Sequence, residues 1–371
     1  MNIENNTQCQ IALSLLPRLN AIFSLPLMDR CGGIRAFFEE SEQALAAIYQ
    51  ELEIHTPLPD RAKALEEAKR ELEKADLYGI RTCDATEEGY PPLLRECEDA
   101  PLVLYYIGNL QTEQADKLLA IVGTRRASSR CQERVDRVID ELCQKGHHPV
   151  IVSGLAYGID AAAHRSSLKH GLRTIAVVGH GLHLIYPAAH KQLASDIVQS
   201  GGALISEYPC TVAIHPSNFL KRNRIVAGMC QATLVAESAI KGGAMSTART
   251  ALSYNREVMA FPGRPEDAYS AGCNQLIKEN VAALVENGLD VSRLLGYPEQ
   301  KPQPQQGELP FFEPEGQASP ILSELQKQGE MHIDELARAT SIDPASLTAL
   351  LLQLELEGKI RALPGQKYSL K

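Results

Sequence analysis

Short apolar runs alternate with longer amphipathic stretches through the middle of the chain. Each run closes on Gly, Ser or Glu and is followed by a segment long enough for a helix. Continuous apolar strands of this kind are typical of a parallel sheet that helices cover on both faces. The pattern therefore predicts an α/β fold, a doubly wound Rossmann-like domain, with strands at 118–122, 149–152, 174–178, 203–205, 233–236 and 258–261.

The pattern changes on both sides of this domain. The N-terminal segment alternates short helical stretches with Pro and Gly breaks and predicts a small helical domain. After Gly296 a Pro- and Gln-rich run predicts an extended linker, and the last fifty residues predict three helices and a two-strand tail, the outline of a winged helix. We expect a helical domain at 1–78, the Rossmann-like domain at 79–296, the linker at 297–317 and the winged helix at 318–371.

Charge is distributed unevenly along the 371 residues. The formal net charge is -9, yet residues 121–264 hold 17 Lys plus Arg against 9 Asp plus Glu. The field that steers a ligand is local, because salt screens it over roughly 8–10 Å. The middle of the chain is therefore suited to a polyanionic ligand, with solvated helix faces as the alternative explanation.

Several classes of protein are disfavoured. The nine cysteines show no Cys-x-x-Cys spacing, and His180, His183 and His190 lack further ligands at a familiar spacing, so we expect no metal. Gly179-x-Gly181 lacks the third glycine of a dinucleotide site, so we expect no cofactor. No apolar run approaches the roughly 20 residues that cross a bilayer, and the start lacks a signal peptide. We expect a cytoplasmic protein with no membrane partner.

The loops that follow the predicted strands carry the candidate chemistry, because open α/β sheets bind ligands at the carboxyl ends of their strands. Gly123 permits a tight turn, Arg125 can bind an anion, and Ser128 is a natural N-cap for the next helix. The alternative is that Gly123 only forms a turn at the end of the strand and binds no ligand. Residues 219–224, Phe-Leu-Lys-Arg-Asn-Arg, add three cations where a loop or helix start is expected.

A second loop resembles a phosphate cradle. Gly242 and Gly243 let a phosphate approach backbone amides, with Ser246 and Thr247 as further donors. No Walker loop, nucleophile elbow or zinc-protease helix is present, so we predict phosphate recognition and no catalytic residue. An acid–base pair of Asp160 and His164 is an alternative, but we expect structural roles for the four loop residues Asp160, His164, Glu207 and Glu237.

Many motifs occur in the order of one known family. They are Gly123-x-Arg125-x-x-Ser128, Ser153-Gly154-x-Ala156-x-Gly158-Ile159-Asp160-x-x-Ala163-His164, Ser206-Glu207, Arg222-Asn223-Arg224, Glu237, Gly243-Ala244-Met245-Ser246-Thr247-Ala248, Pro262-Gly263 and Gly272-x-Asn274-x-Leu276-Ile277. Over roughly residues 80–290 the chain strongly resembles the DNA-processing protein A (DprA, or Smf) family.

The resemblance implies a homodimer that binds single-stranded DNA and helps to load the RecA recombinase onto it during natural transformation, with no established reaction. It implies that Arg125, Lys221, Arg222 and Arg224 contact DNA, and Phe219 is a candidate for base stacking. Because the chain has no Trp and few aromatics, we expect phosphate contacts to carry most of the affinity. The full expected DNA-binding set is Gly123, Arg125, Ser128, Gly154, Phe219, Lys221, Arg222, Asn223, Arg224, Gly242, Gly243, Ser246 and Thr247.

Two parts of the chain depart from that pattern. The N-terminal domain resembles the family's helix-hairpin-helix-like (SAM-like) module, but residues 15–20 lack the Gly-x-Gly hairpin that grips a DNA backbone. The candidate recognition helix of the winged helix, 344–357, has no Lys or Arg. An acidic helix should not lie against phosphates, so we expect a regulatory or protein–protein role for this domain.

The main alternative is a Rossmann-like nucleotide phosphoribohydrolase. Such enzymes carry Gly-Gly-x-Gly-Thr-x-x-Glu, whereas this chain has Met245 and Ser246 at the Gly-Thr positions and Arg249 at the carboxylate. The acid that would help to cleave a glycosidic bond is therefore missing. A scaffold whose basic loops are incidental is the remaining possibility.

Overall fold

The computed structural model describes residues 6–16, 21–112, 117–298 and 318–371. The chain divides into two compact units, Met1–Glu299 and Gln300–Lys371. The first contains the N-terminal helices and a large sheet, and the second contains a small three-stranded sheet with helices. Nearly all of the expected 297–317 linker lies outside the described residues, as does part of the 15–20 segment.

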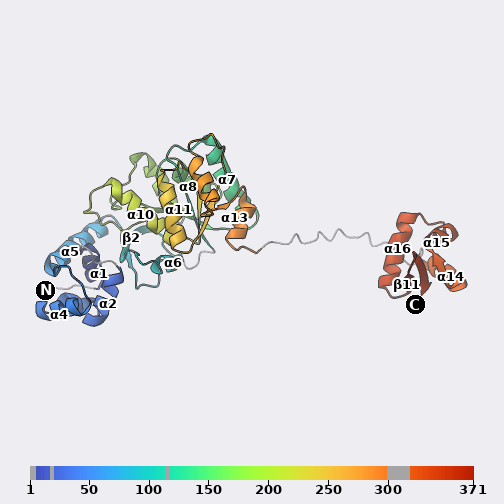
Figure 1. Cartoon of the computed structure of the whole chain (residues 1–371), viewed down its shortest axis with the longest axis horizontal. Helices are drawn as coiled ribbons and strands as arrows, with labels where there is room; N and C mark the ends of the chain where they lie inside the picture. The colour runs from blue at the N-terminus through green and yellow to red at the C-terminus, as the bar shows by residue number, and fades with distance from the viewer. Residues whose placement is uncertain (1–5, 17–20, 113–116, 299–317) are drawn as a thin grey trace. The chain divides into compact units, whose positions relative to one another are not determined.

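The described part of the first 78 residues consists of helices that share one core. Ser41 and Asp60 cap two of them, each accepting a hydrogen bond from a backbone N–H three residues on. Phe37 packs edge-on against Phe38 at 5.0 Å, and the core around them continues onto β2, β5 and β6 of the sheet. The helices are α1 (Asn6–Leu15), α2 (Ala21–Cys31), α3 (Ile34–Glu39), α4 (Glu42–Glu51) and α5 (Arg61–Leu77) (Figure 1).

The sheet of the first unit has nine strands in the order β1-β2-β6-β5-β4-β3-β7-β8-β9. All neighbours from β6 to β9 are parallel, whereas β1 and β2 are antiparallel additions at one edge. The strands are β1 (Arg81–Asp84), β2 (Val103–Gly108), β3 (Leu118–Gly123), β4 (Val150–Ser153), β5 (Thr174–Val177), β6 (Ala203–Ser206), β7 (Ala232–Glu237), β8 (Glu257–Ala260) and β9 (Ala283–Leu284).

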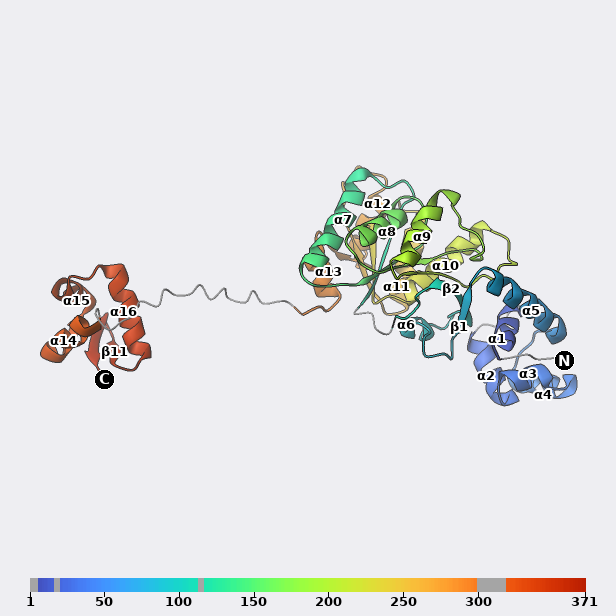
Figure 2. The same cartoon turned by 180° about the vertical axis from the view of Figure 1, so that it is seen from behind.

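Helices cover both faces of this sheet. Successive side chains of β3 point to opposite faces, so that Leu118, Ala120 and Val122 enter one core while Leu119 and Ile121 enter another. Figures 1 and 2 show these helices from opposite sides of the molecule. The first is covered by α6 (Pro92–Arg95), α10 (Pro216–Gly228), α11 (Gly243–Ser253) and α12 (Ala271–Lys278), and the second by α7 (Ser129–Gln144), α8 (Ile159–Lys169), α9 (Lys191–Gln199) and α13 (Gly288–Leu294).

The strand order reverses between β3 and β7. The chain steps from β3 through β4 and β5 to β6, then returns through α10 to β7 on the other side of β3. Such a reversal leaves a crevice outside the carboxyl ends of the two strands. The Thr124 N–H donates to the Glu237 carbonyl at 2.7 Å, and the Glu237 carboxylate accepts from the Ser128 N–H at 2.8 Å. These bonds tie the two loops together at the crevice.

The predicted fold class is confirmed, and each predicted strand of the sheet is present within about two residues of its expected bounds. The apolar run 102–107 likewise predicts β2, whereas β1 and β9 are not individually predicted. Strand β9 has only two residues, too few to show a pattern. The basic run 219–224 lies inside helix α10, in its first turns.

The second unit has the outline that the sequence predicts. Leu347, Leu350, Leu351 and Leu354 of the third helix enter its core together with residues of the other elements, and Asp343 caps that helix by accepting from two backbone N–H groups. A short strand that the sequence pattern does not predict, β10, completes the sheet, whose order is β10-β12-β11. The elements are α14 (Ala318–Gln328), β10 (Glu330–His332), α15 (Ile333–Thr340), α16 (Pro344–Leu356), β11 (Ile360–Leu363) and β12 (Lys367–Leu370).

His164 of α8 is buried in the first unit and behaves as a neutral core residue. Its Nδ1 lies 2.7 Å from the Thr174 hydroxyl, which itself donates to the Ile151 carbonyl, so Nδ1 carries the proton and Nε2 has no partner. Burial, with smaller effects of Arg222 and His190, lowers the pKa of His164 to about 3. A second proton on Nε2 would place an unpaired cation in the core.

We expect His164 to make the protein less stable in mild acid. Its folded-state pKa lies below the unfolded value of about 6.5, so the unfolded chain takes up the proton first and stability falls between about pH 6.5 and 3. Between pH 7 and pH 5 this residue should lower the free energy of unfolding by about 2 kcal/mol. In denaturant titrations at pH 7 and pH 5, the free energy of unfolding should therefore fall by about 2 kcal/mol less in His164→Asn than in the parent protein. Equal losses in both proteins would contradict the assignment.

Candidate functional site

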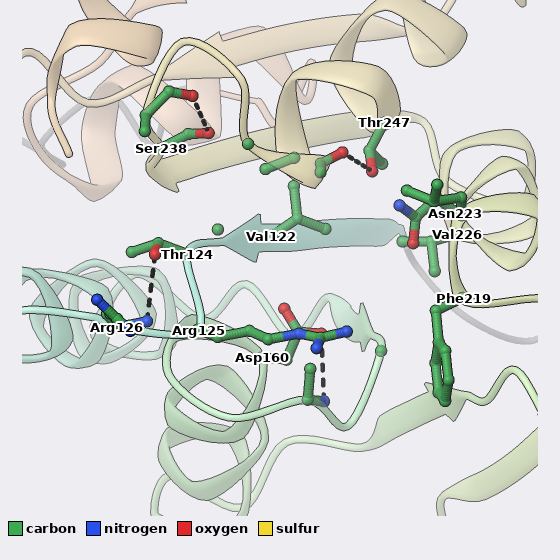
Figure 3. Close-up of a pocket in the computed structure, with 18 of the residues that line it drawn as sticks. Val122, Thr124, Arg125, Arg126, Asp160, Phe219, Asn223, Val226, Ser238 and Thr247 are labelled. Carbon is green, nitrogen blue, oxygen red and sulfur yellow. Dashed lines mark hydrogen bonds between the residues drawn. The ribbon is translucent and has the colours of Figure 1, made fainter. Parts of the chain in front are cut away.

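A cavity of about 540 Å³ opens at the switch point between β3 and β7. Its wall comes from the loops after β3, β4 and β7 and from the first turns of α10 (Figure 3). Helix α10 begins with Pro216, at a position where the backbone N–H would have no partner within the helix. Of the residues predicted to bind DNA, those that line the cavity are Gly123, Arg125, Gly154, Phe219, Arg222, Asn223, Gly242, Gly243 and Thr247.

Helix α11 begins at the wall of this cavity. Its N-cap, Gly242, has no side chain to satisfy the first backbone N–H groups, and Gly243 and Ala244 line the cavity beside it. A side chain at Gly242 would collide with Ser238, because an added Cβ would lie 2.4 Å from the Ser238 hydroxyl oxygen. The open amides and the positive end of the helix dipole favour an anion such as a phosphate.

Three exposed cations, Arg125, Arg126 and Lys241, line the same cavity. The Arg125 guanidinium carbon lies 5.9 Å from the centroid of the Phe219 ring, and Arg126 donates to the Tyr269 hydroxyl at 3.5 Å. Among the described residues no ion pair joins these three side chains to a carboxylate, unlike Arg224 and Arg249 elsewhere. Their charges are therefore available to a polyanion.

Arg222 has a different environment, because its side chain is only 4% exposed. Its Nη1 donates to the Val177 carbonyl at the end of β5. Gly154 lies directly against the guanidinium, where an added Cβ would be 2.0 Å from Nη1. Burial lowers the pKa of Arg222, and the charge of Asp160 opposes that shift. Arg222 therefore holds α10 against β4 and β5, and its direct contact with DNA stays a prediction.

Asp160 is the one carboxylate among the residues that line the cavity, and it too is buried. Its Oδ2 accepts from the Ala156 N–H at 3.3 Å. Burial raises the pKa of Asp160, while the charge of Arg222 lowers it. His164 bonds to Thr174 instead of Asp160, so the described contacts do not join the two in an acid–base pair.

The other predicted site residues lie outside this cavity. Ser128 caps α7 by accepting from the Cys131 N–H at 3.2 Å, and Glu237 accepts from the Ser128 N–H. Arg224 pairs with Glu207 at 2.5 Å, so a phosphate would compete with that carboxylate. Lys221 is exposed on α10, and Ser246 is exposed on α11, where it lines a neighbouring shallow cavity.

The residues that line the cavity but are absent from the predicted site set include Thr124, Arg126, Lys241 and Tyr269. Arg126 follows Arg125 in the sequence, and Lys241 precedes Gly242. Their positive charge beside predicted site residues could have identified both from the sequence. Tyr269 belongs to the loop before α12 and reaches the cavity through the fold alone. No sequence motif marks it.

The arrangement is suited to holding a chain of phosphates. It combines open amides, exposed cations and an aromatic ring, which together bind a single strand without reading its bases. Hydrolysis of a glycosidic bond normally uses two carboxylates, and the cavity lining contains only the buried Asp160. The described residues also contain no group of His, Cys, Asp or Glu arranged to hold a metal ion.

Fold and site together define a class: a Rossmann-like protein with a cationic, amide-lined cavity at its topological switch point. Comparison with known families narrows this class. Residues 81–296 match the family of the DNA recombination-mediator protein A, and residues 300–366 match the DprA winged helix domain. The chain belongs to the DprA/Smf family.

Curated relatives agree with this assignment. Protein Smf of Escherichia coli is 37% identical over 286 residues, which cover 76% of this chain and 75% of the relative. The DNA processing protein DprA of Streptococcus pneumoniae is 42% identical over 205 residues, which cover 55% of this chain and 71% of the relative.

Solved structures of two relatives have a similar fold. The X-ray structure of DprA from Streptococcus pneumoniae has a TM-score of 0.63 at 33% identity, covering 79% of this chain and 98% of that chain. DNA processing protein A from Helicobacter pylori, whose structure concerns its single-stranded-DNA-binding mode, has a TM-score of 0.53 at 28% identity, covering 60% of this chain and 98% of that one.

Membrane insertion of a helix finds no support in the structure. None of the helices in the described ranges combines the length and the apolar character that a membrane span requires.

Gly154→Ala should destabilise the first unit. The new methyl group would overlap the Arg222 guanidinium, which must leave its bond to the Val177 carbonyl. Overpacking of this kind costs about 1–3 kcal/mol, measurable as a lower denaturant midpoint. Gly89→Ala is the control, because its added Cβ would have only Cys83 Sγ nearby, at 4.0 Å. If both variants unfold at the midpoint of the parent, Arg222 is not held as described.

Proposed function

We propose that this protein binds single-stranded DNA without sequence specificity and loads the RecA recombinase onto it, during natural transformation and homologous recombination. The observation that carries the proposal is the set of exposed cations and open α11 amides around one cavity at the switch point. The Helicobacter pylori relative, whose single-stranded-DNA-binding mode has been described structurally, supports the same ligand.

The proposed interface divides its residues by role. Arg125, Lys241 and the α11 amides at Gly243 and Ala244 would hold consecutive phosphates beside Gly242, whose own N–H donates to the Ala239 carbonyl at 2.9 Å. Ser246 and Thr247 would be further donors and Phe219 a stacking face. Arg222 and Asp160 would set the position of α10 from beneath. Lys221, exposed on the same helix, would extend the contact beyond the cavity.

We also propose a homodimer, whose mass in sedimentation would be twice the 40.6 kDa of one chain. The division at 1–78, 79–296, 297–317 and 318–371 remains part of the proposal, with a regulatory or protein–protein role for the winged helix. The helix α16 carries no Lys or Arg, and its exposed Leu352 and Leu356 suit a protein surface better than a phosphate backbone.

We propose no catalytic reaction. The phosphoribohydrolase alternative needs a carboxylate where this chain has Arg249, which is exposed and pairs with Glu279 at 3.6 Å. A guanidinium cannot act as the missing acid or nucleophile, so the Gly-Gly loop lacks the group that would cleave a glycosidic bond.

Arg125→Ala/Lys241→Ala should weaken binding of a labelled 30-nucleotide single strand and make it less sensitive to salt. Each lost phosphate contact removes about 0.7 from the slope of log K against log salt, so the double variant should lose about 1.4. The measurement is fluorescence anisotropy at four salt concentrations, with the duplex of the same sequence in parallel.

The matched control is Arg137→Ala/Arg165→Ala, which removes two exposed cations that do not line the cavity. It should change affinity and slope much less. If both double variants lose equally, binding reflects the diffuse charge of the segment and not this cavity. Absence of binding by the parent protein would refute the proposed function itself.

Loading should accelerate assembly of RecA on the strand. With single-stranded DNA limiting, addition of the protein should shorten the lag before RecA filaments form, as followed by the rise in RecA-dependent ATP hydrolysis. Arg125→Ala/Lys241→Ala should restore most of the lag, because a loader must hold the strand. A lag that the parent protein leaves unchanged would limit the function to DNA binding.

A further inference from the structure

We propose that Tyr186 forms, with Phe219, a two-ring stacking platform for DNA bases beside the cavity. The inference deepens the proposed function and rests on it, because it assigns the place where bases of the bound strand lie. It adds a residue from the loop after β5, a segment that contributes no residue to the predicted binding set.

The two rings meet at the edge of the phosphate-binding cavity. Their centroids are 5.6 Å apart and their planes are tilted by 43°. Phe219 lines the cavity and has Arg125 above its ring, while Tyr186 is 49% exposed. Three separate elements, namely the loop after β3, helix α10 and the loop after β5, thus bring one cation and two aromatic rings together.

The loop that carries Tyr186 is held in place by a buried histidine. The His180 Nε2 accepts from the Tyr186 N–H at 3.2 Å, and Nδ1 lies 3.0 Å from the Gly181 carbonyl, to which it donates. The Ser206 hydroxyl donates to the His180 carbonyl at 2.8 Å. Burial lowers the pKa of His180 and keeps Nε2 unprotonated, as accepting a hydrogen bond requires. Hydrogen bonds within the protein therefore fix the backbone that carries the Tyr186 ring.

An ordered, half-exposed ring at this place has a physical use. Stacking tolerates any sequence because every base has a π-face, and it complements phosphate contacts that read no sequence. Other half-exposed tyrosines have different neighbours: the ring of Tyr78 lies against His183, with centroids 5.9 Å apart. Tyr186 is in ring contact with a residue that lines the cavity, so the exposed ring adjoins the site.

The test is the affinity of a labelled (dT)20 for Tyr186→Ala, Tyr186→Leu and Tyr186→Phe. Loss of one stacked base weakens binding about 5- to 150-fold, and we expect this for Ala and Leu. Phe keeps the π-face and should stay within about twofold of the parent. The salt slope should not change, because no cation is removed. An oligonucleotide of the same length with abasic sites throughout should bind the parent protein and Tyr186→Ala equally.

Tyr78→Ala is the control for loss of a half-exposed ring, and thermal unfolding checks that every variant is folded. Parent-like binding of (dT)20 by Tyr186→Ala, or an equal loss on the abasic oligonucleotide, would overturn the platform while leaving the proposed function intact. A parent protein that binds neither oligonucleotide would overturn the proposed function as well. If Tyr186→Leu bound (dT)20 as tightly as Tyr186→Phe, the contact with DNA would be apolar and would not be base stacking, which would also overturn the platform.

Discussion

The burial of one guanidinium, that of Arg222, sets the geometry on which the candidate site depends. The cation lies beneath Gly154, donates to the Val177 carbonyl and is attracted by the charge of Asp160, so it connects α10 to β4, β5 and the start of α8. A buried cation is costly unless such partners compensate it, and removal of one partner leaves the other uncompensated. Helix α10 therefore has little freedom to shift relative to the sheet edge.

This anchoring determines which residues of α10 are available for binding. With Arg222 facing inward, Phe219 and Asn223 face the cavity, one turn apart on the helix, while Arg224 turns toward Glu207. The basic run thus divides into a structural cation, a paired cation and an exposed one. The charge excess of the middle segment describes the region, but it does not say which charges are free.

The cavity itself follows from the topology. The strand order reverses between β3 and β7, and the backbone bond from Thr124 to Glu237 holds the loops after these strands in contact. The N-terminal end of α11 presents its amides at one side of the cavity. Helix α10, which crosses back over the sheet, forms the opposite side of the cavity. Helix α10 connects β6 to β7 and therefore passes the switch point between β3 and β7, where the α11 amides lie. Amides and cations meet at the cavity for this reason. The family model matched by residues 81–296 spans all of the residues that line this crevice.

The sequence by itself determined the α/β class, the positions of the central strands and the loops that carry the site, because apolar runs of a covered parallel sheet are visible without any partner. Arg125 and Gly242-Gly243 were predicted in this way, since both lie in loops that follow such runs. The tertiary structure alone decided that Arg222 is buried, that Arg224 is paired and that Tyr269 and Tyr186 adjoin the cavity. Burial and pairing depend on contacts between residues far apart in the chain, such as Gly154 with Arg222 or Tyr186 with Phe219, and a linear pattern of residue types does not encode those distances.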